Sequence, residues 1–324
     1  MLSRVAESIY WMNRYVERAE NVARFLHVNL HLMLDYPGES PQQQWEPLVT
    51  TSGDDEDFFK RYGVASEENV IRFLTFDEEN PNSIISCLHA ARENGRTIQD
   101  TISSEMWEHL NQFYLMVEKH SRKKTVRSLH DFYSSVKNAS HLYVGLAETT
   151  MSHGEGWHFG KLGRLLERAD KTARILDVKY FILLPKLDDV NTPYDSLFWS
   201  ALLKSASAFE MYRKRFHKIF HHDVADFLIF DPKFPRSLYC CTLMAQHSMN
   251  MIQQKMPETP PAALELEKLL RSFQTNDIDF IVNNGLHEFI DTFQYNLNIV
   301  GREIQNSFFA LKPIEVEQSY RNCC

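Results

Sequence analysis

The sequence predicts an all-α protein, and three of its features support that prediction. Apolar residues recur mostly at intervals of three and four, which is the spacing of one face of an α-helix. The 324 residues contain only 11 glycines and 12 prolines, which is few for the turn-rich chain of a sheet protein. No segment shows the sustained alternation of apolar and polar residues that indicates a β-strand.

Helix caps and helix breakers set the limits of the predicted helices. Ser83 and Ser237 stand where a hydroxyl accepts a hydrogen bond from the first turn of a helix, and Pro185 stands where a helix has to end. The predicted helices span 3–34, 54–62, 66–75, 83–101, 103–120, 127–151, 155–184, 194–221, 223–230, 237–254, 261–274 and 285–311. The segments predicted to be loops or a loose tail are 37–50, 186–193 and 312–324.

Composition and charge exclude several classes of protein. The net charge of −8 argues against nucleic acid as a partner, because a surface that binds phosphates needs concentrated positive charge. No apolar run approaches the roughly 18 residues that a membrane helix needs. The start, MLSRVAESIYWMNR, lacks the apolar core of a signal peptide, and five cysteines are too few and odd in number for a disulfide framework. The sequence therefore predicts a soluble, cytoplasmic protein with no membrane partner, and leaves open whether the chain forms a homo-oligomer.

Three segments of the first half of the chain recur in the second half in the same order. The pairs are RYVERAENVARFL (14–26) with RLLERADKTARIL (164–176), FLTFDEENPNSIISC (73–87) with FLIFDPKFPRSLYCC (227–241), and LHDF (129–132) with LHEF (286–289). The offset grows slowly from 150 to 157 residues, and the first pair is identical at 7 of 13 positions, where roughly one would match by chance. We therefore predict a tandem duplication, with halves 1–151 and 152–324 that each form a helical bundle and pack as one compact unit about a pseudo-twofold axis.

The first recurrent segment carries a polar stripe rich in arginine. At about 100° per residue its charged and amide side chains fall within a sector of about 120°, and the second copy repeats that sector. The stripe residues are Arg14, Glu17, Arg18, Asn21 and Arg24 in the first copy, and Arg164, Glu167, Arg168, Lys171 and Arg174 in the second. A guanidinium group binds a carboxylate or phosphate through two parallel hydrogen bonds and stays charged when it is buried. Small residues beside the stripes, such as Ala19 and Ala169, would let another helix approach closely.

Two interpretations of the stripes stay open. In the structural interpretation the two copies pack together, so that Glu17 meets an arginine of the second copy and Glu167 an arginine of the first. In the binding interpretation the stripes line a cleft for an acidic ligand, with Glu17 or Glu167 available as an acid or base. The excess of arginine over carboxylate within each stripe favours a ligand, whereas charges that neutralise one another need none.

These recurrent motifs resemble those of a known family. The duplicated ERA helices, AARENGRTIQDTISSEMWEHLN (90–111) and DPKFPRSL (231–238) are similar to the Alpha-E family, all-helical bacterial proteins named for a recurrent Glu-Arg motif. The resemblance covers nearly the whole chain, and the motif residues retained are Glu17, Arg18, Glu167, Arg168, Arg92, Glu93, Glu105, Trp107 and Arg236. HSMN (247–250) stands where the first half has RENG, so the two halves are not chemically equivalent. Members of the family accompany circularly permuted ATP-grasp amide ligases and transglutaminase-like peptidases, so the resemblance implies a role in making or modifying a peptide.

Further residues outside the stripes indicate a site less strongly. Arg92 and Glu93 lie one helix before Glu105, and Trp107 would form the wall of a pocket beside them. A salt-bridge cluster between helices explains the same residues without a ligand. Arg236 directly precedes a helix cap, where its side chain would join the first backbone N–H groups in binding a carboxylate or phosphate.

Histidines at helical spacing raise the question of a metal site. The candidate pairs are His27 with His31, His217 with His221, and Glu155 with His158. The last pair has the spacing of a di-iron helix, but a di-iron bundle needs a second such pair, and the duplicated positions hold Val5 and Ser8. His130 and His287 recur beside an acidic residue, and we expect them to be core histidines with satisfied hydrogen bonds. No nucleotide-binding or hydrolase motif occurs, and the sequence predicts neither a metal nor a cofactor.

Three functions follow from these features. The first, which we favour, is an accessory helical subunit of an ATP-grasp-type amide or peptide ligase system that binds an acidic peptide or amino-acid intermediate on its arginines. The second is a stand-alone transferase or hydrolase acting on a peptide product with glutamate as acid or base, and the third is a structural scaffold without a ligand. The residues predicted to be catalytic are Glu17, Glu167 and Glu105, and those predicted to bind ligand are Arg14, Arg18, Arg24, Arg164, Arg168, Arg174, Arg92, Arg236 and Trp107.

Overall fold

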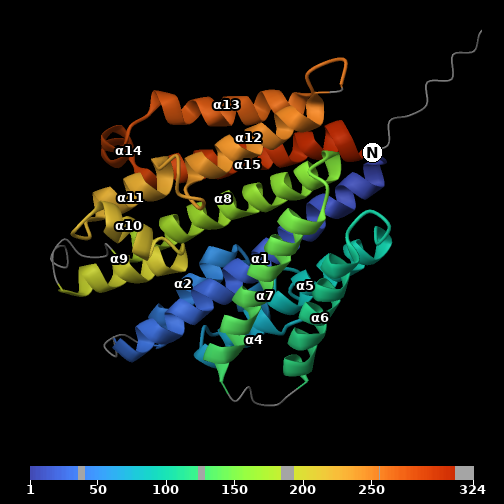
Figure 1. Ribbon diagram of the computed structural model, residues 1–324. Helices are drawn as coiled ribbons and strands as arrows, with labels where there is room; N and C mark the ends of the chain where they lie inside the picture. Colours follow the sequence, from blue (N-terminus) through green and yellow to red (C-terminus); the bar gives the residue numbers. More distant parts are fainter. Residues whose placement is uncertain (36–40, 123–127, 184–192, 255, 311–324) are drawn as a thin grey trace, which may run out of the picture.

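The computed structural model describes residues 1–35, 41–122, 128–183, 193–254 and 256–310, which form helices and no β-strand (Figure 1). The predicted all-α class is therefore confirmed for this part of the chain. The first seven helices are α1 (Ser3–Asp35), α2 (Pro41–Ser52), α3 (Asp55–Tyr62), α4 (Glu67–Thr75), α5 (Ile84–Thr97), α6 (Ser104–Ser121) and α7 (Leu129–Thr150). They are followed by α8 (Glu155–Leu183), α9 (Pro193–Ser205), α10 (Phe209–Arg215), α11 (His221–Phe230), α12 (Leu238–Gln253), α13 (Pro261–Thr275), α14 (Ile278–Asn284), α15 (Leu286–Ile304) and the π-helical turn η2 (Gln305–Phe309).

Serine caps begin helices where the sequence predicts them. The hydroxyl of Ser83 accepts a hydrogen bond from the backbone N–H of Ser86 at 3.2 Å, and that of Ser237 accepts one from Cys240 at 3.0 Å. Each hydroxyl satisfies an N–H group that has no partner inside its own helix. Both predicted caps are therefore confirmed.

The loop predicted over 37–50 is wrong for the residues from Pro41 onward, because α2 begins there. Proline suits the first turn of a helix, since its missing N–H would have no partner in that turn. Trp45, Leu48 and Val49 follow at helical spacing, and all three are buried. Their packing against the rest of the molecule stabilises a helix that the polar start of the segment does not indicate.

Three other boundaries differ from the prediction. The single helix predicted over 194–221 is wrong, because α9 and α10 are separated at Ser207, whose φ of 53° lies in the left-handed region that a right-handed helix cannot contain. The helix predicted over 83–101 ends four residues early, and that predicted over 285–311 passes from α15 into η2. Helix α14 lies in a segment for which no helix is predicted.

The buried apolar side chains form two cores. One core is built by α1 to α7 within residues 9–147, and the other by α8 to η2 within residues 159–309 together with Ala6 and Tyr10 of α1. Figure 1 shows α12 and α15 beside α8, with α13 packed on these two helices, in one part of the molecule. In the other part α5 and α7 lie beside α1, and α6 packs on α5 and α7. Each core thus follows one predicted half of the chain, while the pseudo-twofold relation between the halves stays a prediction.

Helices α1 and α8 pack against each other where the two parts of the molecule meet. A Cβ atom on Gly163 would lie 2.5 Å from the carbonyl oxygen of Tyr10, so glycine is needed where the two backbones approach. Ala19 and Ala169 are buried, as expected for small residues between closely packed helices. This packing brings the two arginine stripes together.

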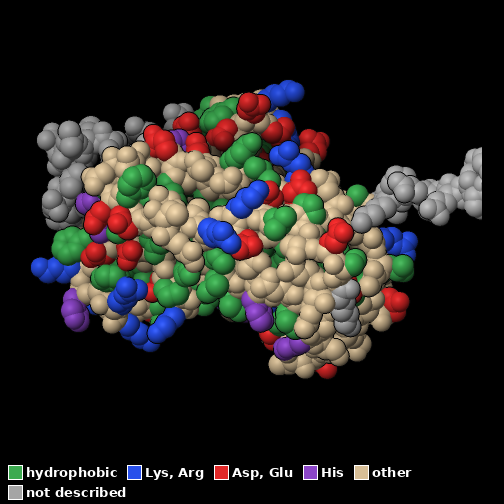
Figure 2. All heavy atoms as spheres, turned by 90° about the horizontal axis from the view of Figure 1, so that it is seen from above, with side chains coloured by type: hydrophobic (Ala, Val, Ile, Leu, Met, Phe, Trp, Pro, Cys, Tyr) green, Lys and Arg blue, Asp and Glu red, His purple; other side chains and the backbone are tan. Residues whose placement is uncertain are grey.

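The surface of the molecule is mixed in charge where Figure 2 shows it. Acidic and basic side chains lie interspersed on that face, so the face offers no extended basic surface. Among the helices that the structure describes, none combines the length and apolar character that a membrane span requires.

Candidate functional site

Two reciprocal ion pairs join α1 to α8. Arg168 of α8 donates two hydrogen bonds to the carboxylate of Glu17 of α1, both at 2.8 Å. Arg18 of α1 donates two to the carboxylate of Glu167 of α8, at 2.6 and 3.0 Å. Each helix thus supplies an adjacent Glu and Arg, and each side chain binds its opposite on the other helix. The contacts that the structural interpretation predicts, in which each glutamate meets an arginine of the other copy, are therefore present.

Arg236 adds a third partner on the Glu17 side. Its guanidinium group donates to Glu17 at 3.2 Å, to Asn21 at 3.0 Å and to Glu20 at 2.9 Å. Only 9% of the Arg236 side chain is exposed, and Arg24 also pairs with Glu20. The anions that Arg236 binds are therefore carboxylates of α1, and the contact ties the turn before α12 to that helix.

The Glu167 side has a different set of neighbours. Arg14 donates to Glu167 at 2.9 Å, and the ammonium group of Lys171 lies 4.0 Å from its carboxylate. Arg18, which binds Glu167 through two nitrogens, also donates to Asn82 at 2.6 Å. The carboxylate of Glu167 is fully buried among these groups.

The arginines keep both glutamates ionised. Burial alone would raise the pKa of Glu17, but the charges of Arg168 and Arg236 outweigh burial and lower the pKa to about 2. Burial also opposes ionisation of Glu167, and Arg18 with its cationic neighbours holds that pKa far below the usual range of a carboxyl group. Such carboxylates exchange protons poorly near neutral pH, which argues against the predicted acid–base role.

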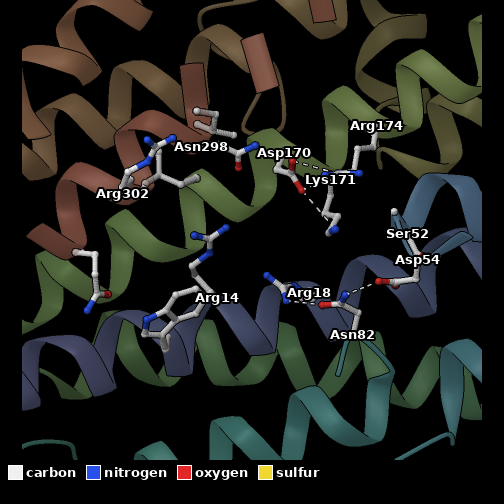
Figure 3. Close-up of a pocket in the computed structure, with 16 residues that line it drawn as sticks. Arg14, Arg18, Ser52, Asp54, Asn82, Asp170, Lys171, Arg174, Asn298 and Arg302 are labelled. Atoms are coloured by element: carbon white, nitrogen blue, oxygen red, sulfur yellow. Dashed lines mark hydrogen bonds and ion pairs between the residues drawn. The ribbon is translucent and has the colours of Figure 1, made fainter. Parts of the chain in front are cut away.

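A cavity of about 520 Å³ opens beside the Glu167 side of the interface (Figure 3). The charged residues that line it are Arg14, Arg18, Lys171, Arg174, Arg302, Asp54 and Asp170. Figure 3 shows Arg14 and Arg18 of α1 and Lys171 of α8 directed into the same central space. With Glu167 behind the two α1 arginines, five positive groups face three negative groups, which leaves a net charge of +2. The cavity therefore suits an anionic ligand.

Two arginines of the cavity differ in how they are held. Arg174 donates to Asp170 at 3.1 Å and lies over Gly53, where a Cβ atom would be 2.6 Å from its Nη1 atom. Gly53 also has a φ of 85°, which glycine adopts without strain. Arg302 of α15 is exposed and forms no ion pair with any residue that the structure describes. Its guanidinium group is therefore available to a ligand.

The other predicted ligand-binding residues of the stripes do not line this cavity. Arg24 and Arg168 contact carboxylates of α1 on the Glu17 side. Arg164 donates to Glu148 of α7 at 3.2 Å and is almost fully buried. These contacts hold helices together, and the stripes contribute Arg14, Arg18, Lys171 and Arg174 to the cavity.

Arg92, Glu105 and Trp107 lie apart from the stripes. Arg92 of α5 donates to Asn111 of α6 at 2.7 Å, and Trp107 packs beside Gly95. Glu105 is exposed in the first turn of α6. The described residues that line the cavity include none of these three.

Several cavity residues are absent from the sequence-based prediction. Lys171 is a stripe residue that the list of predicted ligand-binding residues leaves out, and Asp170 lies next to it in the recurrent segment. Arg302 follows Lys171 by 131 residues, and Asp54 belongs to the turn after α2. No motif marks either position, and only the packing of α15 and α2 against α8 brings them to the cavity.

The expected core location is wrong for both recurrent histidines. His130 is exposed at the start of α7, and 41% of the His287 side chain is exposed at the start of α15. Successive residues of a helix point about 100° apart, so a histidine that follows a core residue such as the buried Leu286 need not face the core. His287 lies 2.8 Å from Asp177 of α8, whereas His130 contacts histidines of α1.

Comparison with known proteins finds a family model that matches most of the chain. The model of the Alpha-E family, described as a predicted alpha-helical domain with a conserved ER motif, matches residues 1–309. Three proteins called uncharacterized, one from Mycobacterium bovis and two from strains of Mycobacterium tuberculosis, are 24% identical to this chain over 255 residues. Each match covers 72% of this chain and 28% of the relative, so the chain spans less than a third of the length of these relatives. No solved structure matches the chain.

Proposed function

Because this chain belongs to the Alpha-E family, whose description names an ER motif of the kind that joins α1 to α8 here, we propose that this motif supports a cavity that binds an acidic ligand. The observation that carries the proposal is the charge of the cavity, where five cationic side chains outnumber three carboxylates. A carboxylate of an acidic peptide or amino acid would neutralise the surplus and form charge-assisted hydrogen bonds with the guanidinium groups.

The cavity cations divide into two groups by their existing contacts. Arg18 is occupied by Glu167 and Asn82, so its main contribution is to hold α1 and α8 together. Lys171 lies 3.4 Å from Asp170 and 4.0 Å from Glu167, Arg174 pairs with Asp170 at 3.1 Å, and Arg302 forms no ion pair with any described residue. We assign the ligand to these three cations. Their positions on two different helices suit a ligand with more than one anionic group.

We further propose that the ligand is a peptide or amino-acid intermediate of an ATP-grasp-type amide ligase system in the cytoplasm, with this protein as its accessory helical subunit. The support is the family, since the resemblance to Alpha-E proteins implies such a ligase as the partner. The test is amide-bond formation by the ligase of the same organism, measured with and without this protein. Hydrolysis of ATP by this protein alone contradicts the accessory role.

The two alternatives make different predictions. The enzyme alternative is less well supported, because Glu17 and Glu167, two of its predicted acid–base groups, are buried in bidentate ion pairs. A scaffold without a ligand predicts that every arginine of the cavity serves stability alone. Arg302 separates the scaffold from the binding protein, since it has no ion pair within the described residues.

The deciding experiment is calorimetric titration with glutamate, a triglutamate peptide and inorganic phosphate. Arg302→Met should weaken binding of the acidic probe by about tenfold or more, since a hydrogen bond to a charged group contributes about 1.5–3 kcal/mol. The melting temperature should stay unchanged. Arg96→Met, which removes an exposed arginine outside the cavity, is the matched control. If no acidic probe binds, or if Arg302→Met binds as the wild type does, the proposal is wrong.

We also propose that the two halves are related by duplication, as the recurrent segments suggest. Each half has its own apolar core, and the ER motifs of the two halves contact each other reciprocally. The duplicated positions differ in charge, because Asn21 corresponds to Lys171 and Arg236 corresponds to Asn82. Asn21 and Arg236 contact the glutamate of α1, whereas Lys171 and Asn82 lie on the α8 side. The smaller Asn82 leaves room for the cavity, whereas the long Arg236 side chain occupies its own side of the interface.

A further inference from the structure

Three histidines meet where α1 faces the first turn of α7. His27 and His31 lie one turn apart on α1, and His130 is the second residue of α7. The Nε2 atom of His27 lies 2.7 Å from Nδ1 of His130, and Nε2 of His31 lies 3.0 Å from the same atom. The two Nε2 atoms are 3.3 Å apart. One nitrogen of each ring therefore points toward a common centre.

Hydrogen bonds among the three rings cannot satisfy this arrangement. Each ring nitrogen either carries a hydrogen and donates, or has a lone pair and accepts. Three mutually contacting atoms form a closed triangle, and donors and acceptors cannot alternate around three corners. One contact therefore always joins two donors or two acceptors. A cation at the centre removes the conflict, because it binds three lone pairs at once.

The separations of the nitrogens also suit a metal ion. At metal–nitrogen distances of about 2.0–2.1 Å, two ligand nitrogens are separated by about 3.3 Å at a tetrahedral angle and by about 2.9 Å at a right angle. The observed separations of 2.7, 3.0 and 3.3 Å fall close to this range. Small rotations of the exposed His31 and His130 rings are enough to adjust the shortest of them.

The chemistry of the donors selects the kind of ion. Within the described part of the chain no carboxylate bonds to any of the three rings, whereas His287 at the duplicated position pairs with Asp177 at 2.8 Å. Imidazole nitrogens alone suit Zn²⁺, Cu²⁺, Ni²⁺ and Co²⁺, and exclude Mg²⁺ and Ca²⁺, which prefer oxygen. His31 and His130 are exposed, so an ion can enter and keep a coordination position open to water.

We propose that His27, His31 and His130 bind one divalent transition metal ion, with Zn²⁺ as its first candidate, between α1 and α7. The ion fastens the second half of α1 to the start of α7. The site is separate from the anion-binding cavity, because the described residues that line the cavity include none of the three histidines.

Lys137 competes with the metal for His27. Its ammonium nitrogen lies 2.6 Å from Nδ1 of His27. An ammonium group that donates to Nδ1 leaves the hydrogen of the neutral ring on Nε2, which is the atom that faces the other two histidines. Metal binding therefore requires Lys137 to turn away from the ring, and Lys137→Met should bind the metal at least as tightly as the wild type.

Calorimetric titration of the chelator-treated full chain with Zn²⁺ tests the proposal. We expect one ion per chain, and a higher melting temperature when Zn²⁺ is present, because the ion binds the folded state. His31→Ala and His130→Ala should each weaken binding by about 100-fold or more, since even outer-shell partners of a metal contribute about 10–100-fold. His89→Ala, which removes an exposed histidine of α5, should leave binding unchanged.

The outcomes are decisive in either direction. Circular dichroism without metal establishes that the variants are folded, which is expected because His31 and His130 are exposed. Failure of the wild type to bind Zn²⁺ overturns the proposal, and so does binding that His31→Ala and His130→Ala leave unchanged. Loss of binding in Lys137→Met also overturns it, because the lysine would then be a ligand in place of a competitor.

Discussion

Glu17→Gln probes the pairing of α1 with α8 most directly. The substitution keeps the size of the side chain and removes the charge that Arg168 contacts at 2.8 Å through two hydrogen bonds and Arg236 at 3.2 Å. Both guanidinium groups then stay buried without their carboxylate. Removing one partner of a buried ion pair destabilises a protein by about 3–5 kcal/mol.

The pKa of Glu17 gives a second estimate of the magnitude. Folding lowers the pKa from its ordinary value of 4.5 to about 2, because the charges of the arginines outweigh the effect of burial. A difference of roughly 2.5 pH units corresponds to about 3 kcal/mol of stabilisation. Since the pKa is lower in the folded state, this stabilisation is complete above pH 4.5 and is lost as the pH falls through 2. The Gln variant lacks it at every pH.

Urea unfolding followed by circular dichroism measures the effect. The free energy of unfolding of Glu17→Gln should be lower than that of the wild type by about 3 kcal/mol at pH 7 and by only about half as much at pH 3. Glu105→Gln is the control, because Glu105 is exposed and its loss should change stability by less than about 0.5 kcal/mol. A loss below about 1 kcal/mol at pH 7, or an equal loss at both pH values, refutes the assigned role of Glu17.

Two pairs of glycine variants test the packing around the site. Gly53→Ala introduces strain at a positive φ and displaces the guanidinium group of Arg174, so it should lower both stability and the affinity for acidic peptides. Gly63→Ala has a similar φ in open space and should cost only the backbone strain, about 1–2 kcal/mol, with affinity unchanged in calorimetry. Gly163→Ala should destabilise the protein by about 1–3 kcal/mol or more, because its Cβ atom meets the backbone of α1. Gly145→Ala, in open space on helix α7, should stabilise the protein by about 0.5–1 kcal/mol. Equal melting temperatures of Gly163→Ala and Gly145→Ala would contradict the close packing of α1 and α8.

Long helices with regular apolar spacing could be predicted well. The segments predicted as 3–34 and 155–184 correspond to α1 and α8 within one residue at each end. Their periodicity and their breakers are local properties, which the chain carries wherever it packs. The weaker signal of α2 could not be recognised, since its stability depends on the burial of Trp45 against other helices.

The pattern of residues along the chain is enough to predict the all-helical class and the helix face on which Glu17 and Glu167 lie. It also predicted reciprocal pairs of Glu and Arg as one of two interpretations, and the contacts of α1 with α8 confirm these pairs. Helical periodicity indicates which side chains share a face, and the repetition of the stripe indicates that its Glu and Arg residues can pair with those of the other copy.

The place where a surplus of positive charge remains, and the set of histidines that converge, depend on how the helices pack in the folded protein. Arg302 reaches the cavity because α15 packs against α8, and His130 reaches His27 because α7 packs against α1. Periodicity within one helix contains no information about which distant helix will lie opposite. Contacts between residues more than a hundred positions apart depend on how whole helices fill the two cores, and that packing is a property of the folded chain.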